Sequence, residues 1–171
     1  MCATDYLYMI SPADVDAALA SLSAQAEHHV EAGRILRAIK ARGQVVGRVF
    51  NRSSVPAIIS AIGPRYSVRY GIQNGLTRRP RCLYVQRLDD RGDPVLGPNS
   101  RWEFELATAE APRLTAERLD QLITYHRDKS GEYLRAAADL PQKVAEYNAA
   151  AEYLRPIRSA VSGLMLKAGI R

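Results

Sequence analysis

No acidic residue occurs between Glu31 and Asp89, although this segment holds twelve basic side chains. The twelve are Arg34, Arg37, Lys40, Arg42, Arg48, Arg52, Arg65, Arg69, Arg78, Arg79, Arg81 and Arg87. Residues 1–33 carry five acids and no lysine or arginine, and residues 89–171 are nearly balanced, so this block accounts for the net charge of +6. Like charges this concentrated repel one another in the compact state unless an anion or an acidic surface lies against them. We therefore expect the block to contact a negatively charged partner.

Cysteine is scarce, and no long hydrophobic run is present. Cys2 and Cys82 are the two cysteines, and their separation fits neither a metal site nor a redox motif, so free thiols are favoured over a disulfide. No segment approaches the ~18 apolar residues of a membrane span. The first residues lack the basic start and apolar stretch of a signal peptide. These absences predict a cytoplasmic protein.

Catalytic signatures are also missing, because the chain has no Walker loop, no G-x-S-x-G elbow and no Cys-His-Asp order. His126-Arg127-Asp128 resembles a kinase catalytic loop, but Tyr133 stands where that loop requires Asn. We therefore expect a non-enzymatic protein that needs no cofactor. An enzyme using His126 with Asp128 or Glu132 stays open as an alternative.

His28 and His29 form the only histidine pair. Adjacent helical residues point about 100° apart, so these two rings cannot chelate one ion as an i, i+4 pair does. Glu27 and Glu31 flank them in the sequence. We expect surface histidines paired with these glutamates, and no metal site.

Helix signals dominate both ends of the chain. Ser11-Pro12 followed by Asp14 predicts a helix start, apolar residues then recur every three or four positions, and Gly43 predicts the end of this first helix. Ser54 and Gly63 bound a short second helix over 55–62. From Thr115 onward we expect a helix to about Ala138 and, after Pro141, a second helix that Pro156 kinks or breaks.

The middle of the chain has the alternation of β-strands. Tyr66 and Val68 alternate with Arg65 and Arg69, which predicts one apolar and one cationic face, with the tyrosine in the core. Asn74-Gly75 predicts a turn, and Trp102, Phe104 and Leu106 alternate with polar residues in the same way. We expect about four strands, over 45–50, 65–70, 82–88 and 101–107. We expect residues 89–100 to form an exposed, mobile loop in which Arg91-Gly92-Asp93 makes a turn.

The predicted architecture is α+β: a long N-terminal helix, a small antiparallel sheet and a C-terminal helical hairpin in a single domain over 1–171. Its three parts are residues 1–43, the Arg-rich and mostly β region 44–110, and residues 111–171. The C-terminal stripe has a 4–3 spacing that suits internal packing, and the alternatives are dimerisation or docking on another protein. The stripe runs through Leu140, Val144, Tyr147, Ala151, Leu154, Val161 and Met165.

The favoured function is binding of nucleic acid or a nucleoprotein complex through the arginine-rich middle, because arginine presents a bidentate donor fork to phosphate. No helix-turn-helix, RNP stretch, GXXG loop or zinc finger supports a specific class. The alternative is an inhibitor or adaptor, of the kind that mobile elements or phages encode, that docks on an acidic or apolar surface of a host complex. The residues expected to make the contact are Arg48, Arg52, Arg65, Arg69, Arg78, Arg79, Arg81 and Arg87.

Overall fold

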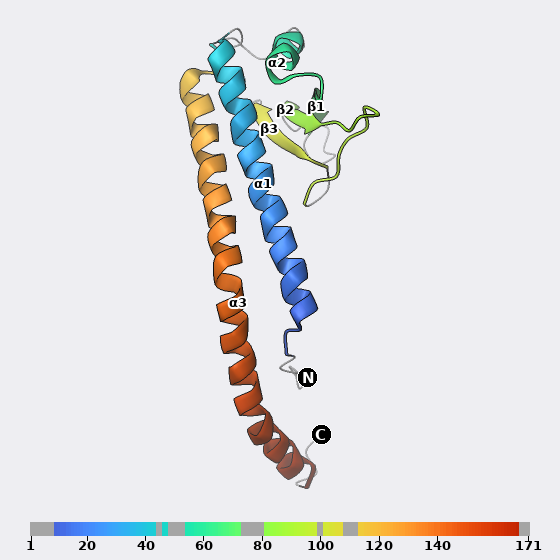
Figure 1. Cartoon of the computed structure of the whole chain (residues 1–171), viewed down its shortest axis with the longest axis vertical. Coiled ribbons are helices and arrows are strands. Elements are labelled where there is room, and N and C mark those ends of the chain that lie inside the picture. Colours follow the sequence, from blue (N-terminus) through green and yellow to red (C-terminus); the bar gives the residue numbers. More distant parts are fainter. Residues whose placement is uncertain are drawn as a thin grey trace. The chain divides into compact units, whose positions relative to one another are not determined.

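The computed structural model describes residues 9–43, 46–47, 54–72, 81–98, 101–107 and 113–167, without the side chains at 70–72, 81–82, 158, 162 and 165–167. Its elements are α1 (Pro12–Arg42), α2 (Val55–Ile62), β1 (Tyr66–Ile72), β2 (Arg81–Arg87), β3 (Glu103–Ala107) and α3 (Ala116–Lys167) (Figure 1). The α+β class is thus confirmed.

The chain divides into two compact units. One is Ser23–Leu134, which holds the sheet, α2, most of α1 and the beginning of α3; we call it the sheet unit. The other joins the chain ends Met1–Leu22 and Arg135–Arg171, and its described part is the start of α1 with the rest of α3; we call it the helical unit. The single-domain expectation stays a prediction, and each unit is described by itself.

The predicted bounds of the first two helices are confirmed. At the start of α1, the Ser11 hydroxyl accepts from the backbone N–H of Asp14 at 3.2 Å, and the Asp14 carboxylate accepts from the N–H of Ser11 at 3.2 Å. This reciprocal cap satisfies two N–H groups that a helix start leaves unpaired. The short helix α2 covers the predicted residues and ends at Gly63.

The sheet has three strands in the order β1-β2-β3, all antiparallel. Tyr66 pairs with Arg87 and Ile72 with Arg81, which confirms that these strands form a hairpin. The predicted turn at Asn74-Gly75 lies outside the described residues. Of the strand expected over 45–50, only 46–47 are described, and they form a turn.

The loop after β2 is ordered by hydrogen bonds that follow from its sequence. The Asp89 carboxylate accepts from the N–H groups of Arg91 and Asp93, and Gly92 has φ of +85°. A positive φ is readily adopted by glycine, so the turn reading of this tripeptide is confirmed. Isolated bridges then join Leu88 to Pro94 and Leu96 to Arg101.

The expected C-terminal hairpin is wrong, because α3 is one continuous helix of 52 residues. Pro141 and Pro156 both lie inside it. A proline removes one backbone hydrogen bond and crowds the preceding turn. Strong helix formers, among them the alanine runs at 136–138 and 149–151, flank the two prolines and let the helix continue through them.

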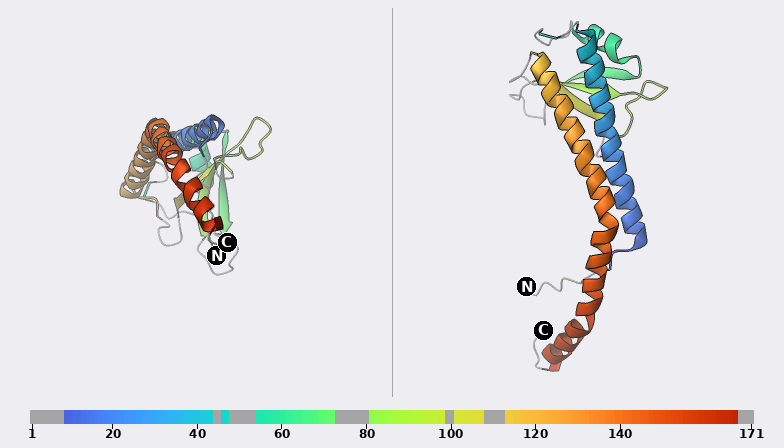
Figure 2. Two further views of the ribbon diagram at one scale, coloured as in Figure 1. Left: turned by 90° about the horizontal axis from the view of Figure 1, so that it is seen from below. Right: turned by 60° about the vertical axis from the view of Figure 1, so that its left-hand side comes forward.

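The hydrophobic core belongs to the sheet unit. There the apolar face of the sheet packs against α1 and the beginning of α3. The ribbons of these elements can be followed in Figure 2. In the core, α1 and α3 run antiparallel, since Lys40 bonds Asp120 while His29 contacts His126. The fully buried side chains of largest volume are Ile35, Leu36, Ile39, Ile58, Val85, Leu106, Leu114 and Leu119.

Candidate functional site

Five of the eight arginines expected to bind a partner have side chains that the structure does not describe. Arg48, Arg52, Arg78 and Arg79 lie outside the described residues, and the side chain of Arg81 does too. Arg65, Arg69 and Arg87 are described, and all three are exposed. Arg69 lies on the opposite face of the sheet from buried Tyr66, as the alternation predicted.

Several described cations of the basic block face carboxylates from distant parts of the sequence. Arg69 bonds Glu103 at 2.9 Å, and its guanidinium lies 5.4 Å from the centre of the Tyr84 ring. Lys40 bonds Asp120 at 2.6 Å. Arg65 reaches Asp90 only at 3.9 Å, with both groups largely exposed, so that pair contributes little. Folding therefore neutralises part of the charge that the sequence concentrates.

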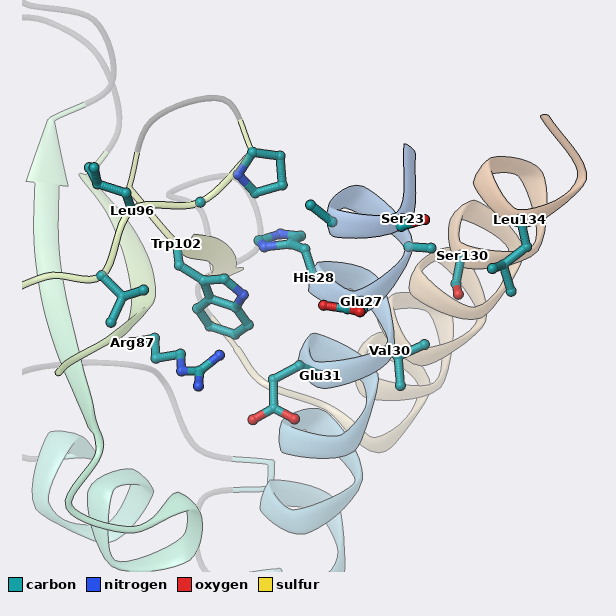
Figure 3. Close-up of a pocket in the computed structure, with 15 residues that line it drawn as sticks. Ser23, Glu27, His28, Val30, Glu31, Arg87, Leu96, Trp102, Ser130 and Leu134 are labelled. Atoms are coloured by element: carbon teal, nitrogen blue, oxygen red, sulfur yellow. The ribbon is translucent and has the colours of Figure 1, made fainter. Parts of the chain in front are cut away.

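A cleft of about 770 Å³ opens in the sheet unit between α1, the loop after β2 and the beginning of α3 (Figure 3). Trp102 and His28 lie side by side within it, with their ring centres 4.9 Å apart, and Trp102 is only 5% exposed. Gly97 lies against the backbone of Trp102, where a β-carbon would be 3.0 Å from the Trp102 Cα. The loop thus lies tightly against the backbone of Trp102.

Aliphatic side chains from three elements line this cleft and remain exposed to solvent. Leu96 of the loop is 81% exposed, Leu134 of α3 57% and Val30 of α1 56%. Single exposed aliphatics are ordinary on a protein surface, but several that line one concave site mark it as a candidate binding surface. The cleft therefore combines a buried aromatic with an uncovered apolar lining.

Charged groups occupy one side of the same cleft. The Glu31 carboxylate accepts two hydrogen bonds from Arg34, at 2.9 Å each, and a third from the Tyr66 hydroxyl. These bonds, with Arg34 contributing most, lower the pKa of Glu31 to about 2, so it is ionised at neutral pH. Figure 3 shows the Arg87 guanidinium pointing toward Glu31. Glu27 has no hydrogen-bond or ion-pair partner in the described part of the chain.

The three histidines converge, which the sequence reading missed. His29 Nδ1 and His126 Nδ1 are 2.8 Å apart, and the His28 ring lies 5.2 Å from that of His29. The expected pairing of His28 and His29 with Glu27 and Glu31 is wrong. The 100° between neighbouring helix positions turns His28 toward Trp102 and His29 toward α3.

The histidine cluster is neutral at physiological pH. Burial, reinforced by the neighbouring rings, lowers the pKa of His126 to about 4, and burial also lowers the pKa of His28 and His29. A direct bond between two Nδ1 atoms requires that one of them carries no proton, and this agrees with neutral rings. Among the described residues, no group of three or more His, Cys, Asp or Glu could hold a metal ion.

The open alternative of an enzyme using His126 gains little from this geometry. Asp128 bonds Arg127 and Glu132 bonds Lys129, so neither carboxylate orients the histidine. A smaller cleft of about 450 Å³ borders His126, and the Arg118 Nε in its lining has no hydrogen-bond partner among the described residues. An imidazole with so low a pKa is a weak general base at neutral pH.

Comparison with protein-family models, curated proteins and solved structures gave no significant match, so the function has to be argued from the residues. In the described part of the chain, no helix is long and apolar enough to cross a membrane. The apolar lining of the main cleft had a partial sequence signal, because Val30 and Trp102 belong to clear periodic patterns. Leu96 sits in the irregular loop, where no pattern distinguishes it.

Proposed function

We propose that the protein is a non-enzymatic protein-binding module whose main cleft takes an extended segment of a partner protein. The carrying observation is that the exposed Val30, Leu96 and Leu134 line the same cleft as the buried Trp102. Peptide-recognition sites use an apolar pocket for one anchoring side chain and polar groups around it for orientation. The proposal corresponds to the inhibitor or adaptor reading of the sequence.

The charges of the cleft narrow the occupant further. Glu31 is already bonded to Arg34 and Tyr66, and Arg87 points toward it, so Glu27 is the lining carboxylate that has no hydrogen-bond or ion-pair partner among the described residues. An arriving segment with a large apolar residue and a neighbouring lysine or arginine would complement this arrangement. Phosphate groups would instead meet the two carboxylates of Glu27 and Glu31, with Arg87 as the opposing cation, so the cleft suits a basic peptide better than nucleic acid.

A phage-displayed library of random peptides, selected on the full chain, tests the proposal directly. We expect enrichment of peptides that carry a large apolar residue next to a basic one. Binding of a synthesised hit should weaken at least about tenfold in Leu96→Asp, because the charge disrupts the apolar lining. Glu27→Gln should weaken hits that contain the basic residue and leave hits without it unchanged.

Arg91→Ala is the matched control, because it lies in the same loop but does not line the cleft. It should bind every hit as the wild type does, while Trp102 fluorescence reports that each variant is folded. A selection without enriched peptides, or hits that bind Leu96→Asp as tightly as wild type, would overturn the proposal.

Nucleic-acid binding is the second candidate, favoured by the twelve cations that the sequence concentrates between Glu31 and Asp89. Exposed ion pairs such as Arg65–Asp90 are weak enough for phosphates to displace. With about 5–7 phosphate contacts, affinity for labelled DNA or RNA should fall by hundreds-fold or more between about 50 and 200 mM salt. Absence of binding at low salt to single-stranded and duplex probes alike would exclude this candidate.

A further inference from the structure

In the helical unit, α3 carries a row of apolar side chains that nothing described in the chain covers. No described side chain after Ala151 on this helix is buried. Ile157 is 52% exposed, Val161 48% and Leu164 65%, while Tyr147 and Leu154 are 40% and 43% exposed. This surface is separate from the cleft of the sheet unit and does not depend on the function proposed for it.

Within this unit α3 has α1 beside it only as far as the residue at which α1 begins. The Asn148 side chain accepts from the N–H of Ile10 at 2.9 Å and donates to its carbonyl at 3.0 Å. Ile10 lies two residues before the first residue of α1, so α1 begins near this clamp and does not extend alongside the later part of α3. Ala151, one turn further along α3, is the last buried side chain. The remaining turns to Lys167 have no described element of this chain against them.

The uncovered side chains follow a seven-residue repeat. Tyr147, Leu154 and Val161 are spaced by seven, and Ala150, Ile157 and Leu164 follow each of them by three. These are the a and d positions of a heptad, which form the seam of a helix pair. Pro156 takes the c position, on the side away from the seam, where its ring would not obstruct a partner helix.

We propose that a second copy of this chain covers the seam, with the two α3 helices packed antiparallel. The seam is then complementary to itself. Centred between Leu154 and Ile157, an antiparallel pair sets Leu154 against Ile157 of the other copy. The next layers join Ala150 with Val161 and Tyr147 with Leu164. All six seam positions find a partner, and the smallest side chain faces a branched one, as close packing requires.

A parallel pair would fit less well. It would set Ala150 against its own copy, leaving space beside a layer of two tyrosines. Packing therefore favours the antiparallel orientation.

The exposed area of the seam side chains limits the expected affinity of the dimer. The seam side chains expose roughly 500–600 Å² per helix, somewhat less than the ~800 Å² per partner of a standard stable interface. We expect a reversible dimer with a dissociation constant of about 1–100 µM. Sedimentation equilibrium of the full chain from about 5 to 500 µM covers this range.

The decisive variant is Leu154→Glu with Ile157→Glu, which buries four carboxylates at the centre of the pair. Its dissociation constant should rise at least about 100-fold. The matched control is Ala149→Glu with Ser159→Glu, which adds the same charge at exposed positions outside the seam and should dimerise as wild type does. Circular dichroism and Trp102 fluorescence verify that both variants are folded. A wild type that stays monomeric throughout, or a dimer that survives the seam variant, would overturn the proposal.

Orientation is tested by crosslinking in a Cys2→Ser, Cys82→Ser background. A mixture of chains carrying Ala150→Cys and Val161→Cys should form disulfide-linked dimers on mild oxidation, because the antiparallel register sets these positions opposite each other. Each variant alone should crosslink weakly. Efficient crosslinking of Ala150→Cys alone, without crosslinking in the mixture, would overturn the antiparallel arrangement.

Discussion

The helix α3 has apolar residues both in the sheet unit and in the helical unit, but they have different roles in the two units. In the sheet unit the helix buries Leu119 and Leu122 in the core and holds His126 at 4% exposure. In the helical unit Leu154, Ile157, Val161 and Leu164 stay exposed, Leu140 and Val144 are half-buried, and Ala151 is the only described side chain of α3 that is buried. One helix thus stabilises the fold over its first part and offers a surface over its second. Apolar periodicity alone does not distinguish these two roles.

The largest expected difference between the two parts concerns truncation of an apolar side chain. Leu36→Ala, in the fully buried core, should lower the free energy of unfolding by about 2–5 kcal/mol, because it removes buried contacts and leaves a cavity. Leu154→Ala should change it by no more than about 0.5 kcal/mol in the monomer. Urea denaturation followed by circular dichroism, at protein concentrations below dimerisation, measures both. Equal losses would contradict the distinction.

Acid should weaken the sheet unit through His126. Its pKa is about 4 in the folded state against 6.5 ordinarily, so the unfolded chain binds more protons between these values. Stability is therefore greatest above pH 6.5, falls as the pH drops toward 4, and loses about 3 kcal/mol in full from this group. His28 and His29, whose pKa values are also lowered, add in the same direction.

His126→Phe checks this prediction, because it keeps a ring in the aromatic cluster and removes the titration. Unfolding free energies from urea titrations between pH 7.5 and 5 should fall less steeply for the variant than for wild type. The charged groups that face this cluster are Arg118 and Glu105, which line the same cleft as His126, and Lys129 and Glu132, which lie near His29. Identical slopes for the two proteins would contradict the assignment.

A smaller difference in the free energy of unfolding is expected between loss of the partly buried Glu31 carboxylate and loss of the exposed Asp120 carboxylate. Glu31→Gln should cost about 1–3 kcal/mol, because Arg34 and the buried Tyr66 hydroxyl both lose a charged acceptor. Asp120→Asn should cost only about 0.2–1 kcal/mol, since its pair with Lys40 is exposed. The Glu31 contribution is fully present above pH 4.5 and is lost as the pH falls toward 2. Thermal unfolding at neutral pH and near pH 2 tests both statements.

Local signals in the sequence predicted local structure well. The bounds of α1 and α2, the β1–β2 hairpin and the buried alternation of Trp102, Phe104 and Leu106 all follow from caps, turns and periodicity. Pro141 misled the prediction of α3, because the cost of one lost hydrogen bond was weighed without the helix formers around it. A proline or glycine is therefore a weaker predictor of structure inside a long helix than at the ends of a helix.

The candidate sites depended on contacts that no local pattern encodes. His29 meets His126 across 97 residues, and Tyr66 meets Glu31 across 35. The basic block looked uncompensated because its carboxylates, such as Glu103 and Asp120, come from later segments. Burial of Trp102 was predictable, but the cleft beside it exists only because the loop, α1 and α3 meet there.

Gly97 gives the cleft an unusual sensitivity to change. Any side chain at this position would press on the backbone of Trp102 rather than on a flexible group that could turn aside. Nearby Leu96 can vary chemically without that obstacle, since it projects into solvent. Descendants of this chain could thus acquire new recognition preferences at position 96 while position 97 stays glycine, so that one residue diversifies and its neighbour is held constant.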